Sequence, residues 1–275
     1  MKAAVPELPP WLAGCLVSDS KLGQAYEDTP PKLRALCKHA LAVLHAFFGE
    51  APDREERSLS RSAQGLYARA CTRPADWALV IVDADYVSAP RLLAALMPAL
   101  LARVPLVLCA STPGPARPEL LCALELAGQE QIYVLDGSQS LDLLRSLAPQ
   151  PGEGRLVLLH RGALSSLRAL AVDAELPCWE EQRAPLLSIC GPEPATALID
   201  LAHPDARRAG DAAPNIAPDA AYCSGPDAVH LQAPLILPPG MEGCWLHPSL
   251  TPDFFRVRAL AFSLAPGHPD TGESA

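Results

Sequence analysis

The stretch WALVIVDADYVSAPRLLAALMPALLARVPLVLCA (residues 77–110) decides the fold class. It opens with WALVIV (77–82), a short run rich in branched apolar residues, which is typical of a strand covered on both faces. SAPRLLAALMPALLA (88–102) follows with the pattern of a helix, and Ser88 is the expected N-cap. A second apolar run, PLVLCA (105–110), completes a strand–helix–strand unit.

The same alternation continues along the chain. Two further apolar runs, QIYVL (131–135) and RLVLL (155–159), are each preceded by a helical pattern, one in RPELLCALELAG (117–128) and one after Gly137. Four apolar strands that alternate with helices at this spacing predict a parallel sheet with right-handed crossovers and helices on both faces. We therefore assign residues 75–162 to a Rossmann-like α/β domain.

Residues 1–74 are predicted to form an N-terminal helical segment that packs with a second lobe. The clearest helix lies in DTPPKLRALCKHALAVLHAFFGE (28–50), where apolar residues recur every three or four positions. Thr29 is the expected cap of this helix and Gly49 its expected end. The charged stretch APDREERSLSRS (51–62) is interpreted as a solvated linker or a helix edge.

The pattern is less regular after Gly162. RAPLLSICG (183–191) is typical of a strand and EPATALIDLAH (193–203) of a helix. Residues 163–265 are therefore predicted to form a second, smaller α/β lobe that includes the C-terminal segment. The small polar tail, residues 266–275, is predicted to be disordered.

Composition restricts the class of partner. The 22 Lys and Arg residues against 31 Asp and Glu give a net charge of −9, which argues against nucleic acid or an anionic membrane as the main partner. The sequence shows no export signal and no apolar run of about 20 residues. Nine cysteines without a CxxC pair predict reduced, mostly buried thiols in a cytoplasmic protein.

Three segments stand in the same order as three motifs of a known family. LMPALLARVPLVLCASTPGPARPELLCALELAGQEQIYVLDGSQSLDLL (96–144) is similar to a strand ending Cys-Ser-Pro-Pro, an Ala/Leu helix and a Gly-Gly-Ala-Gln-Ala turn. AAYCSGPDAVHLQAPLILP (220–238) is similar to Gly-Asp-Tyr-Cys-Ser-Gly-x-Asn-His-Val-Leu-Pro, and SLTPDFFRVRALAFSL (249–264) to a Leu-x-x-x-Asp-Phe segment. The sequence thus resembles the histidinol dehydrogenases over residues 75–162 and 217–262.

The resemblance implies an aldehyde-dehydrogenase-like fold, an intertwined homodimer, and an enzyme that uses zinc and NAD to oxidise L-histidinol. In the family, the Gly-Gly-Ala-Gln-Ala turn contributes a glutamine to the cofactor site. The segment DGSQS keeps this residue as Gln139, with Gly137 before it. A simple helix N-cap turn, with Ser138 or Ser140 as the cap, is the alternative interpretation.

Other cofactor positions depart from the family. The tyrosine and the glycines of its Gly-Leu-Tyr-Val-Pro-Gly-Gly turn fall on Val80, Asp83 and Ala84. An acidic loop repels a pyrophosphate, and side chains block the close approach that glycine permits. The loop LHRG (159–162) likewise lacks the family's Gly-Pro-Gly-Asn pattern. NAD binding is therefore implied by the resemblance alone.

The metal site is also incomplete. Catalytic zinc takes three protein ligands and leaves one position open. DLAHPDA is similar to a family segment that supplies two ligands, and it offers Asp200 and His203 at i and i+3, on one face of a predicted helix. Such pairs also occur by chance. A third ligand position of the family is held by Ala221, which has no lone pair to offer.

The segment AAYCSGPDAVH (220–230) combines Cys, Ser, Asp and His around a Gly-Pro turn. We interpret it as inherited architecture, because the motif persists without its neighbouring zinc ligand. Asp227 and His230 remain candidates to line a pocket, together with Asp83 and Asp85 at the end of a predicted strand.

These observations lead to three hypotheses. In the first, the chain is a pseudoenzyme that binds a small molecule or a partner on a divergent histidinol-dehydrogenase-like scaffold. Two hydride transfers need cofactor, metal and proton-transfer groups together, and each missing group costs about 10²–10⁴ in rate. In the second, it is an NAD-dependent dehydrogenase with a rearranged site at Asp200 and His203. In the third, it is a structural partner in a dimer with a full-length enzyme.

Overall fold

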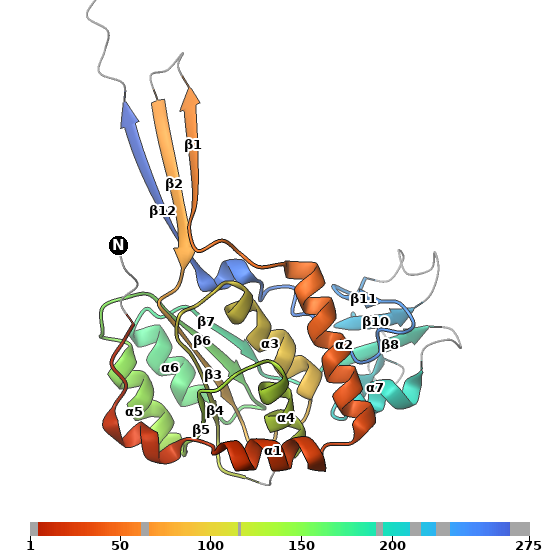
Figure 1. Ribbon diagram of the computed structural model, residues 1–275. Helices are drawn as coiled ribbons and strands as arrows, with labels where there is room; N and C mark the ends of the chain where they lie inside the picture. The colour runs from red at the N-terminus through yellow and green to blue at the C-terminus, as the bar shows by residue number, and fades with distance from the viewer. Residues whose placement is uncertain are drawn as a thin grey trace, which may run out of the picture.

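The computed structural model describes residues 5–61, 66–114, 117–190, 195–209, 216–223 and 232–264 (Figure 1). Its centre is a five-stranded sheet with the order β5-β4-β3-β6-β7 and parallel pairing throughout. The predicted fold class, a Rossmann-like parallel sheet, is confirmed. The strands are β3 (Trp77–Val82), β4 (Val107–Ser111), β5 (Ile132–Val134), β6 (Gly154–Leu159) and β7 (Cys178–Glu181).

Helices cover both faces of this sheet. They are α3 (Ala89–Leu101), α4 (Pro118–Leu126), α5 (Gly137–Leu147) and α6 (Ser165–Asp173). Alternate residues of β3 enter two different cores: Val80 packs with α3 and α4, and Leu79 packs with α5 and α6. Every side chain of β3 is therefore buried, which explains why the strand reads as a continuous apolar run.

The N-terminal helices α1 (Asp19–Asp28) and α2 (Pro31–Phe48) follow a short 3₁₀ turn, η1 (Pro10–Cys15), and pack against α4 and α3 of the sheet domain. α2 ends at Gly49, which has a φ of +64°. Thr29 does not cap α2 as predicted. Instead it ends α1, where its Oγ1 donates a hydrogen bond of 2.7 Å to the carbonyl of Ala25. The two prolines that follow then begin α2.

The charged segment 51–62 is not a linker. It contains β1 (Glu55–Arg61), which pairs antiparallel with β2 (Leu66–Pro74), and β2 pairs in turn with β12 (Arg256–Leu264) near the C-terminus. This ribbon of three strands projects from the body of the molecule (Figure 1). Because most of its described side chains are at least partly exposed, it lacks the apolar pattern that announces a buried strand.

A second, smaller sheet confirms the predicted second α/β lobe. Its order is β11-β10-β8-β9, and all of its pairs are parallel. The elements are β8 (Leu186–Cys190), α7 (Thr196–Ala202), β9 (Arg207–Arg208), β10 (Ala220–Cys223) and β11 (Ile236–Leu237). The 3₁₀ turn η5 (Pro252–Phe255) contacts α3 and leads into β12. The tail predicted to be disordered lies outside the described residues. Among the helices that are described, none combines the length and the apolar character needed to cross a membrane.

Candidate functional site

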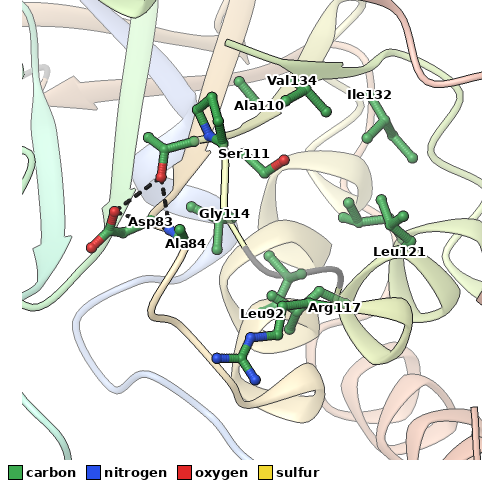
Figure 2. A pocket seen from close by; sticks show the side chains of 15 residues that line it. Asp83, Ala84, Leu92, Ala110, Ser111, Gly114, Arg117, Leu121, Ile132 and Val134 are labelled. Carbon is green, nitrogen blue, oxygen red and sulfur yellow. Dashed lines mark hydrogen bonds between the residues drawn. The ribbon is translucent and has the colours of Figure 1, made fainter. Parts of the chain in front are cut away.

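A cavity of about 140 Å³ lies at the carboxyl ends of β3, β4 and β5, on the face that α3 and α4 cover. Ligands of open α/β sheets bind at this edge. Figure 2 shows Asp83 and Ala84 at one end of the cavity and Ile132, Val134 and Leu121 at the other. The cavity therefore has a polar end and an apolar end. Its lining residues are Val82, Asp83, Ala84, Leu92, Ala110, Ser111, Thr112, Pro113, Gly114, Arg117, Leu120, Leu121, Leu124, Ile132 and Val134.

Hydrogen bonds fix the polar end. Oδ1 of Asp83 accepts from the backbone N–H of Ala84 at 2.9 Å and from Oγ1 of Thr112 at 3.0 Å. The loop after β4 comes so close that a Cβ on Gly114 would lie 2.3 Å from the Cβ of Ala84, so this position requires glycine. Of the predicted pocket residues, Asp83 thus lines the cavity, whereas Asp85 is exposed next to it.

Arg117 is a lining residue that the sequence analysis missed. It is the N-cap of α4, which begins without a side-chain cap. Its Nε is shielded from solvent and has no hydrogen-bond partner in the described part of the chain, and its guanidinium forms no ion pair there. A shielded donor without an acceptor is costly, by about 1–3 kcal/mol. The signal in the sequence is a basic residue directly before a helix that begins with proline.

Gln139 and Gly137 lie at the start of α5. Asp136 caps this helix by accepting from the Gln139 backbone N–H at 2.8 Å, and Gln139 Oε1 accepts in return from the Asp136 N–H at 3.0 Å. The cap is therefore Asp136, and not Ser138 or Ser140 as the alternative interpretation expected. This capping box engages the side-chain amide of Gln139, the residue that the family resemblance assigns to the cofactor site.

His203 is buried where the two lobes meet. Its Nε2 lies 3.0 Å from the hydroxyl of Tyr222 in β10, and its Nδ1 lies 3.2 Å from Oγ of Ser88, the confirmed N-cap of α3. Burial, reinforced by the positive charge of Arg91, lowers the pKa of His203 to about 3. The imidazole is therefore neutral near pH 7, and both of its nitrogens face hydroxyl groups of the protein.

Asp200 is exposed, whereas His203 is buried. α7 ends at Ala202, and His203 has the non-helical backbone of a C-cap, so the two residues do not share one helical face as predicted. The exposed carboxylate of Asp200 pairs with Arg208 instead. Within the described ranges, no three His, Cys, Asp or Glu side chains are grouped so that they could hold a metal ion. These residues do not fit a zinc ion with three protein ligands.

The persistent motif in β10 is well buried in its described part. Ala221 and Tyr222 are 0% exposed and Cys223 is 4% exposed, which agrees with a structural role for this strand. The remaining candidates of the segment, Asp227 and His230, lie outside the described residues. The nine cysteines form no disulfide.

A buried network of charged side chains, here called the lattice, joins the two lobes. Arg91 of α3 is fully buried, and its Nη2 lies 2.6 Å from Oδ1 of Asp205, which follows α7. Its Nη1 lies 3.6 Å from Oε1 of Glu181 at the end of β7. Arg161, after β6, contacts the same Glu181 oxygen at 3.2 Å and also pairs with Asp205. Two guanidinium groups and two carboxylates thus form a closed ring.

Tyr86 completes the lattice. Its ring is flanked by the guanidinium groups of Arg91 and Arg161, at 5.3 Å and 5.2 Å from the ring centre, and its hydroxyl donates to Glu181 at 3.3 Å. Burial alone would raise the pKa of Asp205, but Arg91 and Arg161 outweigh it and lower that pKa. The carboxylate of Asp205 therefore stays charged, and these paired side chains occupy part of the junction between the two lobes.

Comparison with known proteins identifies the fold. No protein-family model matches the sequence, and no curated protein matches it. The structure is similar to a histidinol dehydrogenase from Elizabethkingia anophelis, with a TM-score of 0.62 and 12% identity over 91% of this chain and 77% of that one. Weaker similarities include a succinate-semialdehyde dehydrogenase from Burkholderia pseudomallei (TM-score 0.38, 12% identity, 68% of this chain and 44% of that one) and a lactaldehyde dehydrogenase (TM-score 0.40, 10% identity, 77% and 48%). The expected resemblance to the histidinol dehydrogenase fold is confirmed.

Proposed function

We propose that this protein binds a small molecule in the cavity at the carboxyl ends of β3, β4 and β5, and that it lacks the complete zinc- and NAD-dependent site of histidinol dehydrogenases. The cavity is the observation that carries the proposal, because it joins an apolar end to a cation, Arg117, that has no ion-pair partner among the described residues. The pairing of Asp200 with Arg208 and the engagement of Gln139 in a helix cap support the second part.

The size of the cavity limits the ligand. An apolar cavity of about 150 Å³ holds one benzene-sized ring. The present cavity, at about 140 Å³, therefore accommodates one ring and a small substituent, and it cannot enclose a dinucleotide. Within this proposal the ligand is a compact molecule rather than NAD.

We expect benzamide, a neutral ring compound, to raise the melting temperature. A ligand at ten times its Kd stabilises the native state by about 1.4 kcal/mol, which corresponds to a shift of about 2–4 °C in a chain of this size. Val134→Trp should abolish the shift by filling the apolar end, because Val134 lines the cavity and is 41% exposed. Val172→Trp is the matched control: Val172 is 60% exposed on α6, and this variant should respond like the parent. A shift that survives Val134→Trp would contradict the proposal.

The alternative function is an NAD-dependent dehydrogenase with a rearranged site, and the similarity of fold favours it as the second candidate. Its assay is direct: the protein is incubated with NAD, L-histidinol and zinc, and NADH is followed by absorbance. Sustained NADH formation that His203→Ala abolishes, with the variant still folded, would replace our proposal by this one.

We further propose that the protein is a homodimer in the cytoplasm and that the ribbon β1-β2-β12 forms its interface. Leu260 and Phe262 of β12 pair with Ala70 and Ala68 of β2 on one face of the ribbon. Leu260 is 54% exposed and Phe262 is 66% exposed, and such apolar faces mark interaction surfaces. The intertwined dimer implied by the family resemblance supports a second copy as the partner. Nine cysteines without a disulfide suit a reducing compartment.

Sedimentation analysis tests the interface. We expect the 29.1 kDa chain to sediment at twice its mass, and the double variant Leu260→Asp/Phe262→Asp to sediment as a monomer, because charges on that face oppose its burial. Val172→Asp, which places the same charge on an exposed apolar residue of α6, should remain dimeric. A parent chain that is monomeric at all concentrations would refute the interface.

A further inference from the structure

We infer that Arg117 makes the cavity selective for an anionic ligand: a single ring that carries a carboxylate, with the ring at the apolar end and the carboxylate on the guanidinium. This inference rests on the proposed binding function and names the chemical class of the ligand.

The first argument is the state of Arg117. The other arginines at this edge of the sheet have carboxylate partners, since Arg91 pairs with Asp205 and Arg161 pairs with Glu181, although Nε and Nη1 of Arg91 have no hydrogen-bond partner among the described residues. Arg117 has no hydrogen-bond or ion-pair partner among the described residues, although its Nε is shielded from water. A planar guanidinium binds a carboxylate through two parallel hydrogen bonds, so an anionic ligand supplies the acceptors that the fold does not.

The second argument is the distribution of charge at the polar end. Asp83 is the carboxylate in this lining, and its Oδ1 already accepts hydrogen bonds from Ala84 and Thr112. Asp83 therefore has donors from the protein, and Arg117 is the group that requires a counter-ion. Arg117 also stands at the N-terminus of the nine-residue helix α4, which has no side-chain cap and whose dipole adds positive potential.

The third argument is the apolar end. Leu121, Ile132 and Val134 offer no hydrogen-bonding side chain, so a ligand body of ring size gains from leaving water there. Figure 2 shows these three side chains gathered away from Asp83. A ligand with one apolar ring and one anionic group matches the two ends of the cavity at once.

The test compares benzoate with benzamide, which has the same shape and no charge, by titration calorimetry. We expect benzoate to bind about tenfold more tightly, because hydrogen bonds between charged groups are stronger than those to neutral ones. Arg117→Gln should remove this preference by weakening benzoate binding about tenfold more than benzamide binding. Arg103→Gln is the matched control: Arg103 pairs with Glu50 and Asp53 on the surface and does not line the cavity, so this variant should keep the preference.

The outcomes separate the two proposals. If benzamide and benzoate bind equally well, or if Arg117→Gln keeps the preference for benzoate, the cavity binds small molecules but Arg117 does not select anions. If neither compound binds the parent protein, both the binding function and this inference fail. Val134→Trp distinguishes the cavity from the surface, because benzoate binding that persists in this variant takes place elsewhere and overturns the inference.

Discussion

Replacement of Asp205 by alanine is expected to lower the free energy of unfolding by about 3 kcal/mol or more, because removing one partner of a buried ion pair leaves the other charge buried without compensation. Asp205 contacts both guanidinium groups of the interlobe lattice, and Arg91 is fully buried. Without Asp205, the carboxylate that remains near Arg91 among the described residues is Glu181, at 3.6 Å from its Nη1. This remaining contact places the loss near the lower end of the range measured for broken buried pairs.

Asp200→Ala is the matched control for this prediction. Asp200 also pairs with an arginine of the second lobe, Arg208, but its side chain is 62% exposed. An exposed pair contributes about 0–1 kcal/mol, so this variant should unfold at nearly the parental urea concentration. Urea denaturation of the three proteins measures both effects. Equal losses in the two variants would show that the lattice does not hold the lobes together.

The second large effect is a loss of stability in mild acid. The pKa of His203 is lowered from 6.5 to about 3 in the folded state, mainly by burial, and the pKa of His247 is lowered in the same direction. Below pH 6.5 His203 binds a proton in the unfolded chain, whereas in the folded chain it stays neutral down to about pH 3. The free energy of unfolding therefore falls by about 1.4 kcal/mol per pH unit through His203, His247 adds a loss in the same direction, and the stabilisation is complete only above pH 6.5.

Between pH 6.5 and pH 5 this amounts to about 2 kcal/mol for His203 alone. His203→Gln should reduce the slope of stability against pH by one proton, although it costs some stability at pH 7.5 through the contacts with Ser88 and Tyr222. His45→Gln, which replaces an exposed histidine of α2, is the matched control for the substitution itself. Urea denaturation at pH 7.5, 6.5, 5.5 and 5.0 gives the slopes. A slope that is identical in the parent and in His203→Gln would exclude this origin.

The lattice and the cavity lie at different parts of the carboxyl edge of the sheet. Beyond β6 and β7 the edge is filled by protein charges that pair with one another, with Arg91, Glu181 and Asp205 at the centre. Beyond β3, β4 and β5 the edge is open, and Arg117 has no partner in the described chain. Among the described residues, a ligand therefore meets an arginine without a carboxylate partner at the second place and arginines paired with carboxylates at the first.

The sequence by itself determined the central sheet and the helices that cover it. Strands such as WALVIV (77–82) are buried on both faces, so they consist of a continuous run of apolar residues. Such a run can be recognised without knowledge of the neighbouring strands. The exposed ribbon was not predicted, because β1 is charged and the strands of the ribbon, in which β2 pairs with both β1 and β12, show no apolar periodicity. The short strand β7, which ends in two glutamates, was missed for a related reason.

The site was decided by the tertiary structure. Arg91 and Asp205 are 114 positions apart, and Arg161 and Asp205 are 44 apart, so no local pattern couples them. Asp200 and His203 are close in the sequence, and their spacing suggested that both could bind one metal ion. In the structure α7 ends between them, at Ala202. The periodicity of apolar residues indicates which face of a helix or strand is buried, because that pattern is formed by residues that are close together in the sequence. Whether a charge has a partner depends on distances of a few ångströms between distant segments, and only the folded chain sets those distances.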